Sequence, residues 1–192
     1  MILLADVFEA LIGVRPGNAS EEITGAEIDS RQITRDALFI ALPGEHHDGH
    51  EFVGEAFTAG ARCAFVKNDL SSLYPTIDLR SMHQHEDIDA AFSRIDGAFC
   101  ILMDDPLFGL QQVAKFWRQK LNVEVIGITG SVGKSTTKEV VAEVLSQRYV
   151  TLKNKGNLNN EIGLPLTMLS LTEQHERAVL EMGFYVPGEI QF

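Results

Sequence analysis

The sequence predicts an α/β protein, with a small N-terminal α/β domain ahead of the first part of a parallel-sheet domain that carries a phosphate-binding loop. Two observations support this fold class. Residues 123–129 form a nearly continuous apolar run, followed directly by a glycine-rich turn and a helical stretch. The earlier part of the chain alternates short apolar runs with turns. An Asp-Pro step at residues 105–106 separates the two parts, so we place the domains at residues 1–103 and 104–192.

A helix is expected near the N-terminus, because apolar residues recur there at helical spacing. They are Leu4, Val7, Phe8, Leu11 and Ile12. Asp6 and Glu9 interrupt this segment and no basic run precedes it, which argues against a signal peptide or a membrane span. Strands are expected over residues 37–42 and 63–66, and a helix over 52–59 with Gly60 as its stop. The polar stretch 79–89 gives no assignment.

The second domain is expected to begin with a helix. Asp105 suits the N-cap position, and Pro106 suits the first turn, where its missing N–H costs nothing. The apolar face of this helix is Leu107, Leu110, Ala114, Trp117 and Leu121. The strand over 123–129 is of the kind that is buried on both faces of a parallel sheet. Another helix is expected from Lys134 to about residue 147, and further strands over 149–152 and 178–182.

The composition is that of a globular protein with a strongly acidic balance. Acidic residues outnumber basic ones 27 to 16, for a formal charge of -11. This balance argues against nucleic acid and anionic membranes as partners, because both need a basic surface. Cys63 and Cys100 lie in apolar surroundings and are expected to be buried thiols. We expect a cytoplasmic protein.

The glycine-rich turn predicts a site for ATP and Mg²⁺. Gly130 and Gly133 let the backbone approach phosphate oxygens, while the loop amides and the following helix N-terminus direct positive charge at them. Lys134 adds a full charge for the β- and γ-phosphates and is the expected catalytic residue, and Ser135 supplies a hydroxyl for Mg²⁺. The strict motif has a glycine where this chain has Ile128. The expected ATP-binding residues are Thr129, Gly130, Ser131, Val132, Gly133, Lys134, Ser135 and Thr136.

Two further features lie downstream of this loop. Residues 156–165 contain three asparagines and an acidic residue between two glycines, which suits either a turn before a helix or part of a binding cleft. Glu181 ends the last expected strand, so its carboxylate would lie at the carboxyl edge of the sheet. It would be either a Mg²⁺ ligand across from Ser135 or a solvated strand end.

Several of these segments together resemble the Mur ligases of peptidoglycan synthesis. They are TGSVGKST (129–136), NLNNEIGLP (157–165), LEMG with the later PGEI (180–183 and 187–190), the Asp-Ser-Arg triplet at 29–31 and LFIALPGEHHDGHEF (38–52). The resemblance spans both expected domains but finds no counterpart for residues 70–98. It implies an N-terminal uridine-nucleotide domain and Mg²⁺ ligation by Ser135 and Glu181. It also implies that Ser30, Arg31, Asn159, Asn160 and Glu161 contact the substrate.

The implied reaction consumes ATP to join D-alanyl-D-alanine to a UDP-N-acetylmuramoyl peptide through an acyl phosphate. The family's later catalytic histidine, carbamylated lysine and C-terminal domain would lie beyond Phe192. We therefore expect this chain to be inactive alone. We also expect an unpaired edge on the strand near 178–182 or on another central strand. The full-length form is expected to be a monomer. The alternatives are a folylpolyglutamate or cyanophycin synthetase type of enzyme, and a non-catalytic nucleotide-binding module. Binding of a uridine nucleotide by residues 1–103 would distinguish a Mur ligase of peptidoglycan synthesis from the first alternative, which lacks this N-terminal domain.

Overall fold

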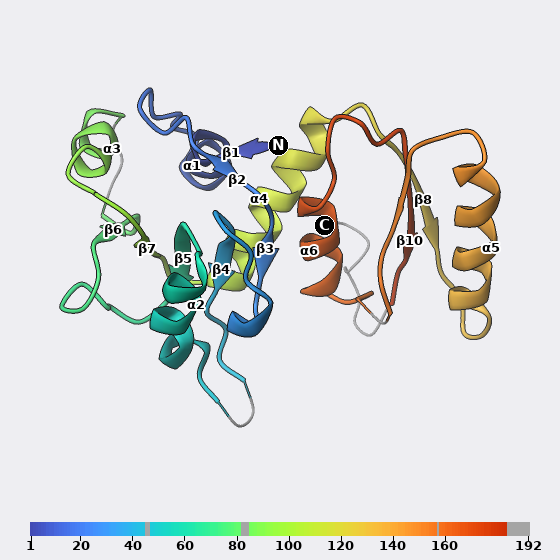
Figure 1. The fold of residues 1–192 in the computed structure, drawn as a ribbon, viewed down its shortest axis with the longest axis horizontal. Coiled ribbons are helices and arrows are strands. Elements are labelled where there is room, and N and C mark those ends of the chain that lie inside the picture. The colour runs from blue at the N-terminus through green and yellow to red at the C-terminus, as the bar shows by residue number, and fades with distance from the viewer. Residues whose placement is uncertain (45–46, 82–84, 157, 184–192) are drawn as a thin grey trace. The chain divides into compact units, whose positions relative to one another are not determined.

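The chain divides into two compact units, residues 1–113 and 114–192, in a computed structural model that describes residues 1–44, 47–81, 85–156 and 158–183 (Figure 1). Each unit contains a parallel β-sheet and a hydrophobic core cluster of its own. The division falls within helix α4 (Pro106–Lys120), just after the domain boundary that we predict from the sequence. The α/β fold class with parallel sheets is confirmed.

The first unit is built on a five-stranded parallel sheet with the strand order β3-β4-β5-β7-β6. Its strands are β3 (Ala26–Glu27), β4 (Leu38–Ile40), β5 (Cys63–Val66), β6 (Thr76–Asp78) and β7 (Phe99–Leu102). A separate antiparallel pair consists of β1 (Ile2–Leu3) and β2 (Glu22–Ile23). The helices are α1 (Leu4–Ile12), α2 (Val53–Ala59), α3 (His85–Phe92) and the first part of α4, with short 3-10 helices η1 (Ser30–Gln32) and η2 (Gly49–Phe52).

The central strands β4, β5 and β7 are buried at every position, because both faces of the sheet are covered. On one face, side chains of these strands form a cluster with Val53 and Ala56 of α2. On the other face, the ring of Phe99 packs edge-on against Phe92, which in turn packs against Phe8 of α1. The predicted N-terminal helix, the strands within 37–42 and 63–66, and the helix that Gly60 ends are therefore confirmed.

The sheet is completed by β6, which lies just before the stretch 79–89 that has no assignment from sequence. Strand β6 pairs with β7 at its edge, and α3 follows after residues 82–84, which lie outside the described part of the chain. Both cysteines are buried free thiols on neighbouring strands, as predicted. Burial raises the pKa of Cys63 to about 12, so this thiol stays protonated at neutral pH.

The second unit contains a three-stranded parallel sheet with the order β8-β10-β9. Its elements are β8 (Glu124–Ile128), α5 (Lys134–Ser146), β9 (Thr151–Lys153), α6 (Gly163–Leu169) and β10 (Arg177–Glu181). Helix α5 packs along one side of these strands, and α6 lies on the other side in Figure 1. The side chain of Trp117, from the end of α4, is buried and donates to the Leu171 carbonyl oxygen at 2.9 Å.

Three predictions for this sheet need correction. Strand β8 is not buried on both faces, since most of its residues are exposed or half-buried. The physical reason is that β8 pairs only with β10 among the described strands, while α5 packs mainly on β9 and β10. The strand expected at 149–152 begins later, at Thr151. Within the described part of the chain, the strand near 178–182 has no unpaired edge, because β10 lies between β8 and β9, which are the two edge strands.

None of the described helices is both long and apolar enough to cross a membrane.

Candidate functional site

The glycine-rich loop connects the carboxyl end of β8 to the first turn of α5. Gly130 and Gly133 have φ angles of 137° and 84°, which residues with a Cβ atom rarely adopt. Lys134 begins α5, and its Nζ donates to the carbonyl oxygen of Gly130 at 2.7 Å. The lysine thus folds back over the loop, where its charge and the free N–H groups of the helix N-terminus can face an anion. Residues 129–136 are exposed, apart from a half-buried Lys134.

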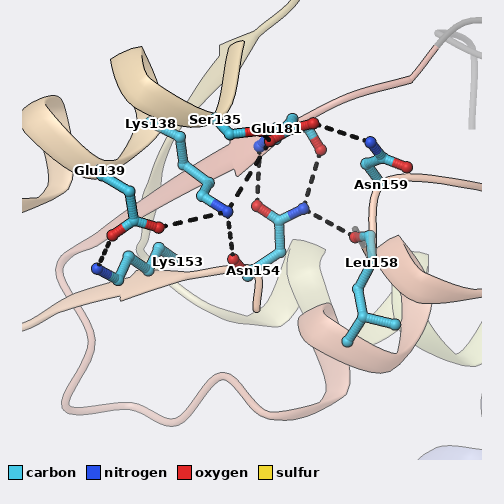
Figure 2. Close-up of polar contacts among 8 residues, drawn as sticks. All are labelled: Ser135, Lys138, Glu139, Lys153, Asn154, Leu158, Asn159 and Glu181. Atoms are coloured by element: carbon cyan, nitrogen blue, oxygen red, sulfur yellow. Dashed lines mark hydrogen bonds and ion pairs between the residues drawn. The ribbon is translucent and has the colours of Figure 1, made fainter. Parts of the chain in front are cut away.

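Glu181 ends β10, and its carboxylate contacts one residue of α5 and one of the segment before α6 (Figure 2). Ser135 Oγ donates to Glu181 Oε2 at 2.7 Å, and Asn159 Nδ2 donates to Oε1 at 2.9 Å. The residue is only 4% exposed. The hydrogen bond from Ser135 lowers the pKa of Glu181, and so do the bond from Asn159 and two nearby lysine charges, against the opposing effect of burial. Glu181 therefore has a buried, ionised carboxylate beside the loop. The alternative interpretation, that this residue is a solvated strand end, is wrong.

The oxygens of Ser135 and Glu181 are chemically suited to a small divalent cation. Mg²⁺ prefers oxygen ligands at about 2.1 Å in octahedral geometry, which places two adjacent ligands roughly 3 Å apart. The two oxygens are 2.7 Å apart, so a small shift would let both face one ion. Within the described residues, no three His, Cys, Asp or Glu side chains gather as a metal site. A cation here would take its remaining ligands from phosphate oxygens and water, as Mg²⁺ commonly does.

A second group of polar residues lies next to Glu181 (Figure 2). Asn154, the first residue after β9, contacts both backbone polar groups of Glu181: its Oδ1 accepts from the amide at 2.8 Å and its Nδ2 donates to the carbonyl oxygen at 3.0 Å. Lys138, on α5, donates from Nζ to the Asn154 carbonyl oxygen at 2.9 Å. Both side chains are buried, with Lys138 at 2% and Asn154 at 1% exposure.

The sequence analysis missed Asn154 and Lys138. A signal for Asn154 existed, because a polar residue directly after a parallel strand lies at the ligand-binding edge of the sheet. Lys138 lies four residues after Lys134 and so on the same side of the helix, but a lysine on an exposed-looking helix gives no sign of burial.

The asparagine-rich segment has two different roles in the structure. Asn159 is buried and contacts Glu181, as described above. Asn160 Oδ1 accepts from the backbone amides of Ile162 at 3.3 Å and Gly163 at 2.8 Å, which fixes the turn into α6. Glu161 is exposed in this turn. The segment therefore combines a helix-starting turn with one residue of the site.

Ser30 and Arg31 lie in the first unit, on η1 after β3. Ser30 is buried, with 5% exposure. The side chain of Arg31 is 80% exposed and pairs with Asp29 through Nε at 2.9 Å and Nη2 at 2.8 Å. Asp29 Oδ1 also accepts from the Arg31 backbone amide at 3.1 Å, which caps η1. The triplet thus forms one turn that displays a guanidinium group at the surface.

The loop after β4, between residues 42 and 52, is held by a histidine whose side chain is 7% exposed. His50 Nε2 accepts from the backbone amides of Lys67 at 2.9 Å and Asn68 at 3.2 Å. Its Nδ1 lies 2.5 Å from Asp48 Oδ1. Because Nε2 accepts two hydrogen bonds, the proton of the neutral ring belongs on Nδ1, facing Asp48. Residues 45–46 of this segment, like the PGEI motif at 187–190, lie outside the described residues.

Two family models match this chain. Residues 128–191 match the Mur ligase middle domain, and residues 22–81 match the model described as the Mur ligase family, catalytic domain. The chain is 44% identical to the UDP-N-acetylmuramoyl-tripeptide–D-alanyl-D-alanine ligase of Bacillus subtilis, over 88% of this chain and 32% of the relative. It is 35% identical to the ligase of the same name from Escherichia coli, over 88% of this chain and 34% of the relative. The chain spans about a third of the length of these relatives.

Solved structures agree with these matches. A crystal structure of MurF from Acinetobacter baumannii is similar with a TM-score of 0.71 and 30% identity, covering 96% of this chain and 36% of that one. The structure of MurF ligase from Thermotoga maritima, in complex with ADP, is similar with a TM-score of 0.64 and 29% identity. The match covers 86% of this chain and 33% of that one.

Proposed function

Because the chain belongs to the Mur ligase family, we propose that it serves an ATP-dependent ligase that joins D-alanyl-D-alanine to UDP-N-acetylmuramoyl-tripeptide. The observation that supports this most directly is the hydrogen bond between Ser135 and Glu181. It joins the first turn of the helix after the glycine loop to the carboxyl end of the neighbouring strand. Phosphate and metal would therefore bind at adjacent points of one sheet edge.

The second unit would bind ATP through the loop. The backbone amides of residues 129–136 and the N-terminus of α5 would hold the phosphates, and Lys134 would exchange its bond to Gly130 for the β- and γ-phosphate oxygens. Ser135 and Glu181 would hold Mg²⁺, which would neutralise charge on the phosphates during transfer to the peptide carboxylate. The amine of D-alanyl-D-alanine would then attack the acyl phosphate and release phosphate.

The first unit would recognise the uridine end of the precursor. Ser30 and Arg31 lie on an ordered turn, and an exposed guanidinium suits a diphosphate because it can donate two parallel hydrogen bonds. We propose residues 1–103 as this uridine-nucleotide domain and 104–192 as the front of the ATP-binding domain. Asn159, Asn160 and Glu161 would shape the part of the cleft next to the metal.

The proposal is tested by nucleotide binding, since the match covers only about a third of the length of the relatives. Lys134→Ala should weaken ATP binding about tenfold to a hundredfold, because each charge-assisted hydrogen bond contributes roughly 1.5–3 kcal/mol. Ser135→Ala should reduce the effect of Mg²⁺ on affinity more than it reduces the affinity for metal-free nucleotide. Calorimetric titration with ATP, with and without Mg²⁺, measures both effects.

The matched control is Lys153→Ala, which removes an exposed lysine of the same unit that pairs with Glu139 away from the loop. It should bind ATP like the wild type. Equal ATP binding by the wild type and Lys134→Ala would refute the assignment of the loop.

A further inference from the structure

The side chain of Asn154, the first residue after β9, extends the pairing of β10 to Glu181, two residues beyond the last backbone pair. The last backbone pair of these two strands joins Val179 to Lys153. After it, the carboxamide of Asn154 accepts from the Glu181 amide and donates to the Glu181 carbonyl oxygen, at 2.8 and 3.0 Å. The one side-chain amide thus supplies both the acceptor and the donor that two backbone groups of a neighbouring strand supply within a sheet. The backbone of Glu181 is thereby held from the side of β9, although β9 has already ended.

Asn154 is itself held by contacts on both sides. Its Nδ2 donates a second hydrogen bond to the carbonyl oxygen of Leu158 at 2.8 Å, which closes the turn toward Asn159. Its own carbonyl oxygen accepts from Lys138 Nζ at 2.9 Å. Asn154 therefore connects the backbone of Glu181 to the segment that carries Asn159, a donor to the Glu181 carboxylate.

Lys138 adds a charge to this arrangement. Its Nζ lies 3.9 Å from Glu181 Oε2 and 3.5 Å from Glu139 Oε1. Burying an ammonium group is costly unless it is paired, and a side chain that is 2% exposed has little contact with water. Lys138 thus contacts Asn154, Glu139 and Glu181. Glu139 is in addition paired with the exposed Lys153, so Glu181 and Asn154 are the buried partners of Lys138 (Figure 2).

We propose that Asn154 and Lys138 are positioning residues for Glu181, which hold its carboxylate in the place where it faces Ser135. This inference rests on the proposed function, because it assigns their purpose to the metal-binding role of Glu181. Neither residue would touch nucleotide or metal. Their effect would be on how strongly Mg²⁺ and nucleotide bind together, since a carboxylate that can move loses alignment with a metal that demands strict geometry.

Two measurements on Asn154→Ala and Lys138→Met test the proposal, with Lys153→Met as the matched control. The control removes a lysine from the same polar group, but one whose side chain lies at the exposed side and pairs with Glu139. The first measurement is amide hydrogen exchange at Glu181, followed by NMR. In Asn154→Ala the Glu181 amide should exchange roughly five to ten times faster, as expected for one lost hydrogen bond. The amide of Ala178, within the paired part of β10, serves as the internal reference for global unfolding.

The second measurement is the ratio of nucleotide affinity with and without Mg²⁺. In both variants this ratio should fall roughly tenfold, while metal-free affinity stays within about threefold of the wild type because the loop is untouched. Lys153→Met should match the wild type in both measurements. A merely structural role would instead weaken both affinities together and speed exchange at Ala178 as much as at Glu181, and that result would overturn the proposal.

The proposal would also be overturned if the ratio of nucleotide affinity with and without Mg²⁺ were the same in both variants as in the wild type. Absence of any Mg²⁺ effect in the wild type would refute the proposed function instead, and exchange at Glu181 would still decide whether Asn154 holds the strand end.

Discussion

Replacing Glu181 with glutamine should destabilise the second unit by about 2–3 kcal/mol. The carboxylate accepts two short hydrogen bonds, from Ser135 at 2.7 Å and from Asn159 at 2.9 Å. Glutamine can preserve both contacts, by accepting from Asn159 and donating to Ser135 Oγ. What is lost is the charge, and charged hydrogen bonds contribute about 1–1.5 kcal/mol more than neutral ones, for each of two bonds. Lys138 also loses one of its two carboxylate neighbours.

Urea denaturation followed by tryptophan fluorescence measures this loss directly. Trp117 is the sole tryptophan of the chain, and it is buried in the second unit. Glu139→Gln is the control, because it removes a carboxylate from the same polar group at an exposed position, and its effect should be much smaller. Wild-type stability of Glu181→Gln would refute the view that the carboxylate is held ionised by its partners.

The same experiment has a defined pH dependence. The pKa of Glu181 in the folded chain lies below the ordinary value of 4.5, because Ser135 and Asn159 donate to the ionised form. A group with a lowered folded pKa stabilises the protein fully above its unfolded pKa, and this contribution disappears as the pH falls through the folded value. The stability difference between wild type and Glu181→Gln should therefore be constant above about pH 5.5 and narrow below 4.5.

Two further predictions concern the other parts of the chain. Ser30→Ala should weaken binding of UDP-N-acetylmuramoyl-tripeptide in a calorimetric titration while leaving ATP affinity unchanged. Unaltered binding by the variant would refute the role of Ser30, whereas absence of binding by the wild type would favour a folylpolyglutamate or cyanophycin type of enzyme. Gly163→Ala should destabilise the second unit by about 1–3 kcal/mol, because an added Cβ would lie 2.5 Å from the Cα atom of Leu158 and the backbone would have to move. A urea denaturation midpoint equal to that of the wild type would contradict this prediction.

Most of the local structure could be predicted from sequence, because it depends on residues close together in the chain. Asp105 accepts from the amide of Phe108 at 3.0 Å at the start of α4, as its N-cap position predicts. Gly60 ends α2 with a φ angle of 112°. The positive φ angles of Gly130 and Gly133 likewise follow from the spacing of the loop. In each case the decisive interaction spans only a few residues.

The errors came from properties that depend on distant partners. The apolar run of β8 predicted burial on both faces, but burial requires covering layers, and the run carries no information about which strands and helices supply them. Likewise, the position of β10 between β8 and β9 follows from strand order, which hydrophobic pattern alone does not specify.

The sequence by itself predicted the phosphate-binding loop and showed the family resemblance, because both depend on residue types at short spacing. The candidate metal ligand Ser135 followed from the loop, whereas the choice of Glu181 as a metal ligand over a solvated strand end rested on the resemblance. Only the tertiary structure decided that Ser135 and Asn159 contact Glu181, because these residues lie 46 and 22 positions away from it in the sequence. It also decided that Lys138 is buried against Asn154. Parallel strands bring their carboxyl ends to one edge, so contacts between remote residues arise only when the sheet forms.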